Sequence, residues 1–364
     1  MRILVAGAGA IGSAVGARLA SAGHRVALLG RGAYVARVRA QGLIVRWPAR
    51  RDRFTDLPVG DAVGPLVETL GGLDLVIVST KVHDTGGACR MVREAVEAAG
   101  ATVLLLQNGV GGDPIAAGAL PGAPLVSGVI TWVVSTVAPG EYVVRNRRRG
   151  VGLAPFVAPA GSGEDRAPIP EDVGRWVRLF REAGVTCRAY DDARAIRWSK
   201  LLLNMLGNAI PAILDLPPSD VFADAGLYSL ERAAFLEAVG VMRAAGIPVV
   251  DLPGYPVRRL VTLMERLPEQ LSRPVMVRLI AGGRSGKAPS LMIDVRSGRG
   301  RSEVTALNGA VVRAGGRLGV STPANAAITE ALVRIVLREI PPSALARNPS
   351  ALLARARMCG WRAS

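Results

Sequence analysis

The stretch that decides the fold is RILVAGAGAIG, residues 2–12. An apolar run typical of a buried strand leads directly into glycines spaced as GxGxxG and a helical pattern over 11–22, the context that a dinucleotide-binding fingerprint requires. Gly7 would permit the tight turn, Gly9 a close approach to a pyrophosphate, and Gly12 close helix–strand packing. The helix N-terminus would offer N–H groups to the anion. The alternative is a glycine-rich turn without a ligand. The expected cofactor-binding residues of this turn are Gly7, Ala8, Gly9, Ala10, Ile11 and Gly12.

The second apolar strand, 25–29, ends at Gly30 and Arg31. NAD-selective sites place an Asp or Glu about 20 residues past the fingerprint, where it binds the ribose 2′-hydroxyl. Gly30 offers no carboxylate, whereas the guanidinium of Arg31 suits a 2′-phosphate. We therefore predict NADP(H) as the cofactor, with Arg31 among its ligands. The alternative is that Arg31 is one more surface arginine.

Short apolar runs alternate with helical patterns through the first half of the chain. Strands are expected at 2–6, 25–29, 42–46, 74–79, 102–106 and 125–130, and helices at 11–22 and 84–99. Continuous apolar runs separated by helices predict a parallel sheet covered on both faces. Residues 141–154 and 185–190 indicate strands of a later antiparallel extension, and the Pro/Gly-rich stretch 156–171 indicates a surface loop. Residues 1–190 are thus expected to form a Rossmann-type domain that binds NADP.

Strand patterns stop near residue 191. Long helical patterns follow at 192–214, 220–246, 255–272, 302–318 and 322–339. They predict an all-helical substrate and catalytic domain over 191–340, followed by a C-terminal appendage, 341–364, with three prolines and a basic end. The fold class is therefore α/β, with a Rossmann-type dinucleotide-binding domain followed by an all-helical C-terminal domain.

The chain of 364 residues carries 45 Lys plus Arg against 29 Asp plus Glu, a net charge of +16. Such a charge raises the question of a nucleic acid or an anionic membrane as partner. The arginines are scattered, however, and the densest run is only Arg145 and 147–149. With 4% aromatic residues, a base-stacking surface is not expected. A field that attracts small anions is the simpler interpretation.

Cysteine and histidine usage excludes several classes of protein. Three distant cysteines and two histidines give neither a disulfide framework nor a zinc pattern, so we expect no metal. No long apolar run free of strong polar groups predicts a membrane span, and the glycines near the start argue against a signal peptide. We expect a cytoplasmic protein without a membrane or nucleic-acid partner.

Only three of the 45 basic residues are lysines: Lys81, Lys200 and Lys287. Lys81 follows the expected strand 74–79, and Asn108, in Gln107-Asn108-Gly109, follows the strand 102–106. Carboxyl ends of strands in an open α/β sheet line the ligand crevice, so both side chains are expected near the cofactor or the substrate. The alternative for Asn108 is a turn residue before glycine. We assign Lys287 no role.

A polar stripe interrupts the apolar segment 192–214. If this segment is one helix, Lys200, Asn204 and Asn208 recur at i, i+4 and i+8 on one face. This composition suggests a partly buried polar site, in which a lysine can donate a proton as a guanidinium cannot. The alternative is an exposed stripe. Glu303 opens a later helical pattern, where on sequence alone a role toward the helix dipole is favoured.

Taken in order, these motifs resemble the ketopantoate reductase (2-dehydropantoate 2-reductase) family. The resemblance runs from residue 1 to about 335 and is carried by GAGAIG at 7–12, Lys81, Gln107-Asn108-Gly109, Lys200-x-x-x-Asn204-x-x-x-Asn208, Pro289-Ser290-Leu291-Met292, Glu303 and Leu307-Asn308-Gly309. It implies a Rossmann domain and a helical domain similar to the C-terminal domain of 6-phosphogluconate dehydrogenase, with the active site in the cleft between them.

The resemblance also implies an activity, the NADPH-dependent reduction of 2-dehydropantoate to (R)-pantoate in pantothenate and coenzyme A biosynthesis. Lys200 matches the general acid that protonates the ketone oxygen, and Glu303 matches an acidic residue near the nicotinamide end. The implied substrate-binding residues are Asn204, Asn208, Ser290 and Asn108, and the implied cofactor contacts include Lys81, Asn108 and Glu303. The partner is a small 2-oxo acid, and a homodimer is left open.

Three departures from the family pattern concern the substrate. One extra residue stands before Glu303, residues 216–219 lack an asparagine that many members have, and residues 131–134 are bulkier and more apolar than usual. Two alternatives therefore stay open: a paralogous reductase of another branched 2-oxo acid, and a non-catalytic dinucleotide-binding regulatory protein.

Overall fold

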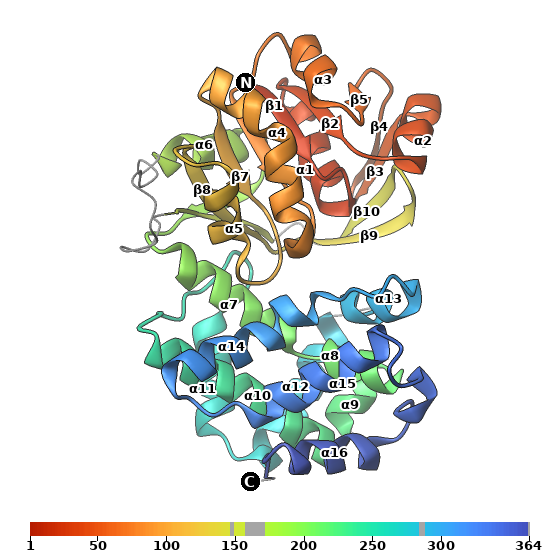
Figure 1. Cartoon of the computed structure of the whole chain (residues 1–364), viewed down its shortest axis with the longest axis vertical. Helices are drawn as coiled ribbons and strands as arrows, with labels where there is room; N and C mark the ends of the chain where they lie inside the picture. Colours follow the sequence, from red (N-terminus) through yellow and green to blue (C-terminus); the bar gives the residue numbers. More distant parts are fainter. Residues whose placement is uncertain (146–148, 157–171, 284–287, 363–364) are drawn as a thin grey trace. The chain divides into compact units, whose positions relative to one another are not determined.

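The computed structural model describes residues 1–145, 149–156, 172–283 and 288–362 (Figure 1). The chain divides into two compact units: unit 1 comprises Met1–Arg197 and Leu252–Tyr255, and unit 2 comprises Trp198–Asp251 and Pro256–Ser364. Every strand that the structure describes lies in unit 1, and unit 2 is built of helices. This is the α/β fold with a helical C-terminal part that the sequence predicts.

An eight-stranded sheet forms the centre of unit 1, in the order β12-β11-β8-β7-β6-β1-β2-β5. Its strands are β1 (Arg2–Ala6), β2 (Arg25–Leu29), β5 (Val59–Gly60), β6 (Leu75–Val78), β7 (Thr102–Leu105), β8 (Leu125–Ile130), β11 (Gly150–Pro155) and β12 (Thr186–Ala189). Neighbouring strands are parallel except for β8 and β11, which are antiparallel. The chain passes from β1 to β2 on one side and returns to β6 on the other, so the fingerprint turn lies at a topological switch point.

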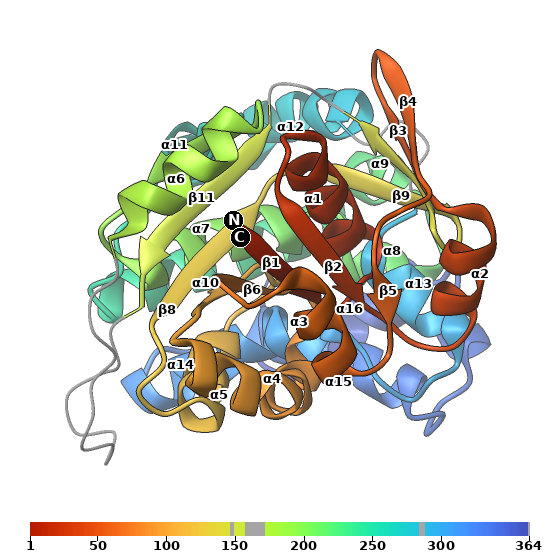
Figure 2. The same ribbon diagram turned by 90° about the horizontal axis from the view of Figure 1, so that it is seen from above.

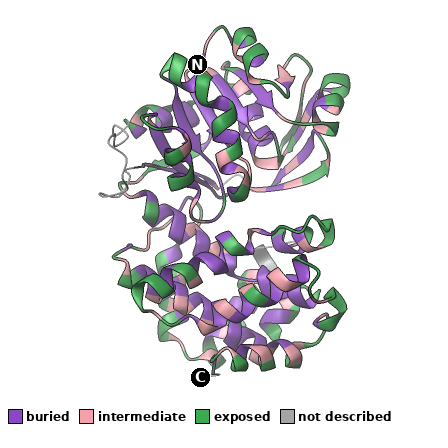
Figure 3. Cartoon of the chain, in the orientation of Figure 1, coloured by how far each residue is buried: buried purple, intermediate pink, exposed green. Residues whose placement is uncertain are grey.

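Helices cover both faces of this sheet (Figure 2). One face carries α3 (Val63–Leu70), α4 (Thr85–Ala99) and α5 (Gly112–Ala119), and the other carries α1 (Ala10–Ser21) and α6 (Val173–Glu182). Every residue of the central strands β6, β7 and β8 is buried (Figure 3). Two-sided burial explains why these strands are continuous apolar runs in the sequence.

A second, four-stranded sheet corrects two of the strand predictions. It comprises β3 (Leu43–Trp47), β4 (Arg50–Phe54), β9 (Val133–Ala138) and β10 (Glu141–Arg145), in the order β4-β3-β10-β9. The predicted strand 42–46 therefore lies outside the parallel sheet, and the predicted stretch 141–154 divides between the two sheets. A short apolar run does not reveal which sheet a strand joins, because its pairing partners are distant in sequence. Helix α2 (Ala33–Gln41) precedes this sheet, and α1 packs against β3, β9 and β10.

Unit 2 is organised around its longest helix, α10 (Ala225–Ala244), which contacts α9, α11, α12, α14, α15 and α16. Its buried side chains include Tyr228 and Phe235. The other helices are α7 (Ala193–Met205, which begins in unit 1), α8 (Ala209–Leu214), α9 (Pro218–Ala223), α11 (Val257–Arg266), α12 (Glu269–Gly283), α13 (Ser290–Ser297), α14 (Asn308–Leu318), α15 (Pro323–Val336) and α16 (Pro349–Met358). The described residues also form three short 3₁₀ turns: η1 (Val82–Asp84, in unit 1), η2 (Glu303–Ala306) and η3 (Pro342–Ala344).

Four predicted long helices are interrupted in the structure, and one of them, 220–246, breaks at Asp224 between α9 and α10. The segment 192–214 breaks between α7 and α8, where Gly207 adopts a left-handed conformation with φ of +58°. The segment 255–272 breaks at Leu267 and Pro268, and 302–318 begins with η2 before α14 starts. The apolar pattern continues through the break at Gly207, so the periodicity of the sequence cannot reveal it. Pro268, by contrast, is a helix-breaking residue that the sequence shows.

The C-terminal segment 341–364 was expected as an appendage. Its described residues, 341–362, belong to unit 2, where α16 buries Leu352 and Ala356 and contacts α10 and α15. No helix among the described residues is long and apolar enough to cross a membrane. Three sequence-based observations lie outside the described residues: nearly all of the loop 156–171, Arg147 with Arg148, and Lys287.

Candidate active site

The glycines of the fingerprint have different surroundings. Gly7 has φ of +100°, and a Cβ there would stand 2.7 Å from the backbone nitrogen of Thr80. A Cβ on Gly12 would collide with the carbonyl oxygen of Gly7. A Cβ on Gly9, by contrast, would meet no atom within 4 Å. Packing alone therefore explains Gly7 and Gly12, and the open space at Gly9 fits the close approach of a ligand to the backbone.

Neighbouring strands hold this turn in place. The N–H groups of Gly7 and Ala8 both donate to the carbonyl oxygen of Leu29, at 3.2 and 3.1 Å. Ser79 Oγ donates to the carbonyl oxygen of Gly7 at 2.8 Å. The first turn of α1, which holds Ala10 and Ile11, contains no acidic residue that would offset the positive end of the helix dipole. A fixed helix N-terminus of this kind suits a phosphate group.

Gly30, where an NAD-selective enzyme would carry an acid, has a steric reason to be glycine. A Cβ at Gly30 would stand 2.5 Å from the ring of Tyr34. The Tyr34 hydroxyl lies 3.0 Å from Ser13 Oγ, and burial raises the pKa of Tyr34. The next residue, Arg31, is exposed. The lack of a carboxylate at this strand end thus follows from the packing of Tyr34.

Lys81 and Asn108 follow the adjacent strands β6 and β7, and both are exposed. The buried amide of Gln107 joins these strand ends, because its Nε2 donates to the carbonyl oxygen of Thr80 at 2.9 Å and to Thr85 Oγ1 at 2.8 Å. Sequence reasoning assigned Gln107 no role of its own. A glutamine directly after a fully apolar strand is the signal that could have identified it.

Unit 2 carries the other predicted site residues. Lys200 and Asn204 lie one turn apart on α7, and both are half-buried. Asn208 does not continue this helix: it occupies the N-cap position of α8, with φ of −123°. The predicted single stripe is therefore wrong in its last member, because the chain turns at Gly207. Asn208 nevertheless stays beside Asn204, since its Nδ2 donates to the Asn204 carbonyl oxygen at 3.0 Å.

The fold brings Asn208 to Ser290, which is 82 positions away in sequence. Asn208 Nδ2 donates to Ser290 Oγ at 3.2 Å, and Asn208 Oδ1 accepts the N–H of Leu291 at 3.1 Å. Asn208 is 5% exposed, so these contacts fix the orientation of its amide. Two residues predicted to bind one substrate are thus in direct contact.

The same helix, α13, also contacts Glu303, through Asp294 one turn after Ser290. The buried carboxylate of Asp294 accepts the N–H of Glu303 at 3.0 Å. Ser302 Oγ accepts the N–H of Val304 at 3.2 Å, so Glu303 begins a 3₁₀ turn and not the predicted α-helix. Before this turn the backbone has positive φ at Gly298 and Gly300, in the region of the extra residue. Sequence reasoning missed Asp294, whose contact with Glu303 depends on the turn between them.

The bulky segment 131–134 has a structural role in unit 1. Thr131 Oγ1 donates to the carbonyl oxygen of Pro253 at 2.8 Å and accepts the N–H of Gly150 at 2.8 Å. The Trp132 ring meets the Trp47 ring edge to face, with centroids 5.8 Å apart. These contacts join the end of β8 to β11 and to the second sheet.

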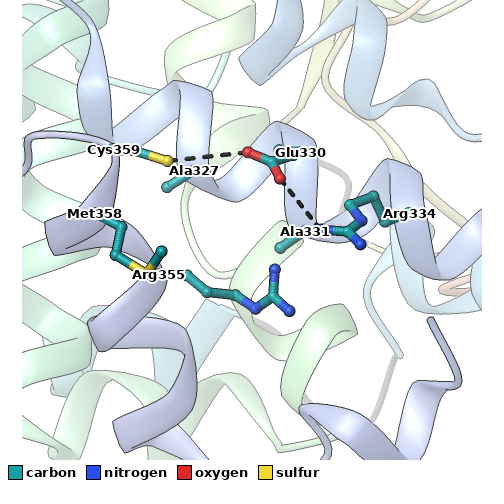
Figure 4. Close-up of a pocket in the computed structure, with 7 residues that line it drawn as sticks. All are labelled: Ala327, Glu330, Ala331, Arg334, Arg355, Met358 and Cys359. Carbon is teal, nitrogen blue, oxygen red and sulfur yellow. Dashed lines mark hydrogen bonds and ion pairs between the residues drawn. The ribbon is translucent and has the colours of Figure 1, made fainter. Parts of the chain in front are cut away.

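Two further features concern metal binding and a surface pocket that no predicted site residue lines. In the part of the chain that the structure describes, no group of three or more His, Cys, Asp or Glu side chains could hold a metal ion. A surface pocket between α15 and α16 is lined by Ala327, Glu330, Ala331, Arg334, Arg355, Met358 and Cys359 (Figure 4). Glu330 lies there 3.5 Å from Arg334 and 3.9 Å from Cys359 Sγ.

A glycine turn at the switch point of a parallel sheet, in a unit followed by helices, defines the class of oxidoreductases that use a nicotinamide dinucleotide. Comparison with known proteins gives the family. The model of "Ketopantoate reductase PanE/ApbA" matches residues 3–154, and the model of its C-terminal part matches residues 192–335. The chain belongs to the ketopantoate reductase family, which confirms the resemblance drawn from the motifs.

Individual relatives agree with this assignment. The chain is 30% identical to the 2-dehydropantoate 2-reductase of Halobacterium salinarum over 93% of this chain and 100% of that protein. The crystal structure of a ketopantoate reductase from Ralstonia eutropha JMP134 superimposes with a TM-score of 0.73, at 27% identity over 93% of this chain and 99% of that one. A D-mandelate dehydrogenase with NADH and anilino(oxo)acetate has the same fold, with a TM-score of 0.73 at 21% identity over 92% of this chain and 98% of that one.

Proposed function

We propose that this chain catalyses the NADPH-dependent reduction of 2-dehydropantoate (ketopantoate) to (R)-pantoate, a step of pantothenate and coenzyme A biosynthesis. The proposal is supported by the family and by relatives named 2-dehydropantoate 2-reductase that align over nearly their whole length. The observation that carries it is the contact between Asn208 and Ser290, because both residues match substrate-binding positions of the family.

The domain at 1–190 is proposed to bind NADP(H). The backbone of residues 7–12 would hold the pyrophosphate at the N-terminus of α1. Arg31 would bind the 2′-phosphate, and Lys81 and Asn108 would contact the cofactor from the ends of β6 and β7. The exposed guanidinium group of Arg31, directly after Gly30, supports NADP(H), because it suits a 2′-phosphate.

The domain at 191–340 is proposed to hold the substrate and supply the proton. When bound, NADPH provides the hydride that adds to the keto carbon. The Lys200 ammonium group would donate a hydrogen bond to the keto oxygen, stabilise the charge that develops there, and transfer its proton to it. Asn204, Asn208 and Ser290 would bind the polar groups of the substrate. Glu303 would be the second catalytic residue, an acidic group near the nicotinamide end.

A steady-state assay of NADPH oxidation across a panel of 2-oxo acids tests this function. We expect the highest kcat/KM with ketopantoate. A clear preference for another branched 2-oxo acid would favour the paralogous reductase, an alternative that the fold allows because a D-mandelate dehydrogenase shares it. No turnover with any 2-oxo acid, together with retained dinucleotide binding, would favour the regulatory protein.

The cofactor preference has its own test in Arg31→Ala. The loss of one charge-assisted contact of about 2 kcal/mol would raise the KM for NADPH roughly 30-fold and leave the KM for NADH unchanged. Arg357→Ala, which removes an exposed arginine from α16, is the matched control for net charge. Equal KM values for NADPH in Arg31→Ala and the wild type would contradict the NADP assignment.

We also propose a cytoplasmic location, in line with three free cysteines.

A further inference from the structure

An arginine that the proposed mechanism does not use is buried near the start of α7. Arg197 is 3% exposed and lies in unit 1, although a charged side chain is rarely buried to this degree without partners. It forms an ion pair with Asp113, which is also buried, at 2.7 Å. In the sequence it is one of many arginines and carries no distinguishing motif.

Arg197 uses its whole guanidinium group. Nε donates to Asp113 Oδ2 at 2.9 Å and to Ser127 Oγ at 2.8 Å. Nη1 donates to the carbonyl oxygen of Gln107 at 2.6 Å. Nη2 donates to the carbonyl oxygen of Leu105 at 2.9 Å and to Asp113 Oδ1 at 2.7 Å. A bidentate pair with two backbone acceptors fixes the position of the side chain far more tightly than a surface ion pair does.

Two of the four partners of Arg197 lie at a strand end that is expected near the cofactor. Leu105 ends β7, and the Gln107 carbonyl belongs to the peptide that continues into Asn108. Arg197 therefore ties the N-terminal part of α7 to the strand end that carries a proposed cofactor contact.

Lys200 lies three residues after Arg197 on the same helix. Residues at i and i+3 are neighbours on a helix surface, with about 5 Å between their Cβ atoms. Because a helix is stiff over one turn, an anchor at Arg197 fixes the place where the Lys200 side chain begins.

We infer that Arg197, with Asp113, is a positioning residue for the proton donor Lys200. This inference rests on the proposed function for the role of Lys200, and it assigns Arg197 no contact with the substrate. Proton transfer is sensitive to geometry, and a displacement of about 1 Å can reduce a rate roughly 100-fold.

Arg197→Met, Arg197→Lys and the double variant Arg197→Met/Asp113→Leu test the inference. The double variant leaves no buried charge unpaired, so it is expected to regain the thermal stability that Arg197→Met loses. Both the single variant Arg197→Met and the double variant should lose roughly 100-fold in kcat. Arg197→Lys should lose less, because it keeps the charge but not the planar guanidinium group that pairs with both oxygens of the carboxylate. Arg194→Met removes an exposed arginine one turn earlier on α7 and is the matched control.

Two further measurements separate positioning from a general structural role. We expect NADPH affinity, measured by fluorescence titration, to change far less than kcat, and the alkaline limb of the kcat–pH profile to shift. Amide hydrogen exchange over residues 198–205 should rise in Arg197→Met and stay unchanged in Arg194→Met. A folded double variant with wild-type kcat would overturn the inference. So would equal losses of NADPH affinity and kcat.

The assay uses whichever 2-oxo acid the wild type reduces, so a different substrate would refute the proposed function and leave this test intact. If the wild type reduces none, the exchange measurement still decides whether Arg197 anchors α7.

Discussion

At the scale of single residues, the chain uses arginine almost everywhere for positive charge and lysine in three places. Lys200 lies half-buried on α7, before the buried Leu201 and Leu202 and one turn from Asn204. An arginine at this position would keep the charge, but it could not release a proton near neutral pH. The choice of lysine therefore matches the role of a proton donor.

Lys200→Ala should lower kcat by roughly 100- to 10,000-fold, the range of general acid catalysis, and leave NADPH binding intact. Lys200→Arg should be nearly as slow, because it restores the charge without a transferable proton. Single-turnover kinetics with pre-bound NADPH would measure this. Unimpaired turnover in Lys200→Ala would remove Lys200 from the proton-donor role.

A second residue-scale prediction concerns acid stability. Hydrogen bonds from the Arg2 side chain hold the pKa of Asp74 below its usual value, and the Arg2 N–H donates to the same carboxylate at 2.7 Å. Because the folded-state pKa lies below the unfolded value of about 3.9, the contact stabilises the folded chain above that pH. The stabilisation is lost as the pH falls through the folded-state pKa.

Asp74→Asn should therefore lower Tm at pH 6, and the difference from the wild type should shrink as the pH is lowered below about 4. Thermal unfolding monitored by circular dichroism at several pH values would measure it. Glu97→Gln serves as control, since the exposed Arg93–Glu97 pair on α4 contributes little to stability. A Tm difference that grows on acidification would contradict the sign of this effect.

At the scale of elements, the break between α7 and α8 determines where Asn208 lies. Gly207 takes φ of +58°, and its N–H donates to Glu231 Oε2 at 3.2 Å from the central helix α10. This turn places Asn208 at the start of α8, where it reaches Ser290. One glycine thus converts a helical stripe into a contact between two segments distant in sequence.

Gly207→Ala should destabilise the protein by about 1–2 kcal/mol, because L-residues with a Cβ are disfavoured in the left-handed region. Gly316→Ala should stabilise the protein, by about 0.5–1 kcal/mol. Gly316 is exposed in the last turn of α14, where a Cβ would meet no atom within 4 Å. Differential scanning calorimetry of the two variants compares the signs directly. A stabilised Gly207→Ala would mean that the turn tolerates another conformation.

At the scale of the whole molecule, the net charge of +16 is spread over both units. A field of this sign attracts the phosphates of a dinucleotide and the carboxylate of a 2-oxo acid, and salt screens it. The same charge would also bind nucleic acid weakly and without sequence preference. Salt dependence therefore separates a small-anion enzyme from a nucleic-acid-binding protein.

The KM for NADPH should rise several-fold between about 20 and 300 mM NaCl, while kcat stays nearly constant. At about 150 mM salt, fluorescence anisotropy with duplex DNA should detect no tight binding. Nanomolar DNA affinity at that salt, in a protein that reduces no 2-oxo acid, would support the regulatory alternative.

The parts of this protein that local patterns encode could be predicted. Most strands of the parallel sheet are apolar runs bounded by turns, and the fingerprint is contiguous, so both are visible within a few residues. The second sheet was not predicted, and the strand 42–46 was placed in the parallel sheet, because β3 pairs with β10, about 100 residues further along the chain. The helix breaks were missed, because burial on both sides of Gly207 leaves the apolar pattern unchanged.

By itself, the sequence determined the class of fold, the order of the two units, the cofactor turn and the family, because each depends on short-range spacing of residue types. Only the tertiary structure decided that Asn208 meets Ser290, that Asp294 holds Glu303, and that Arg197 is buried against Asp113. The physical reason is that these contacts are hydrogen bonds between groups 82, 9 and 84 residues apart. Their geometry depends on how glycine turns and packed helices direct the chain, which no local pattern specifies.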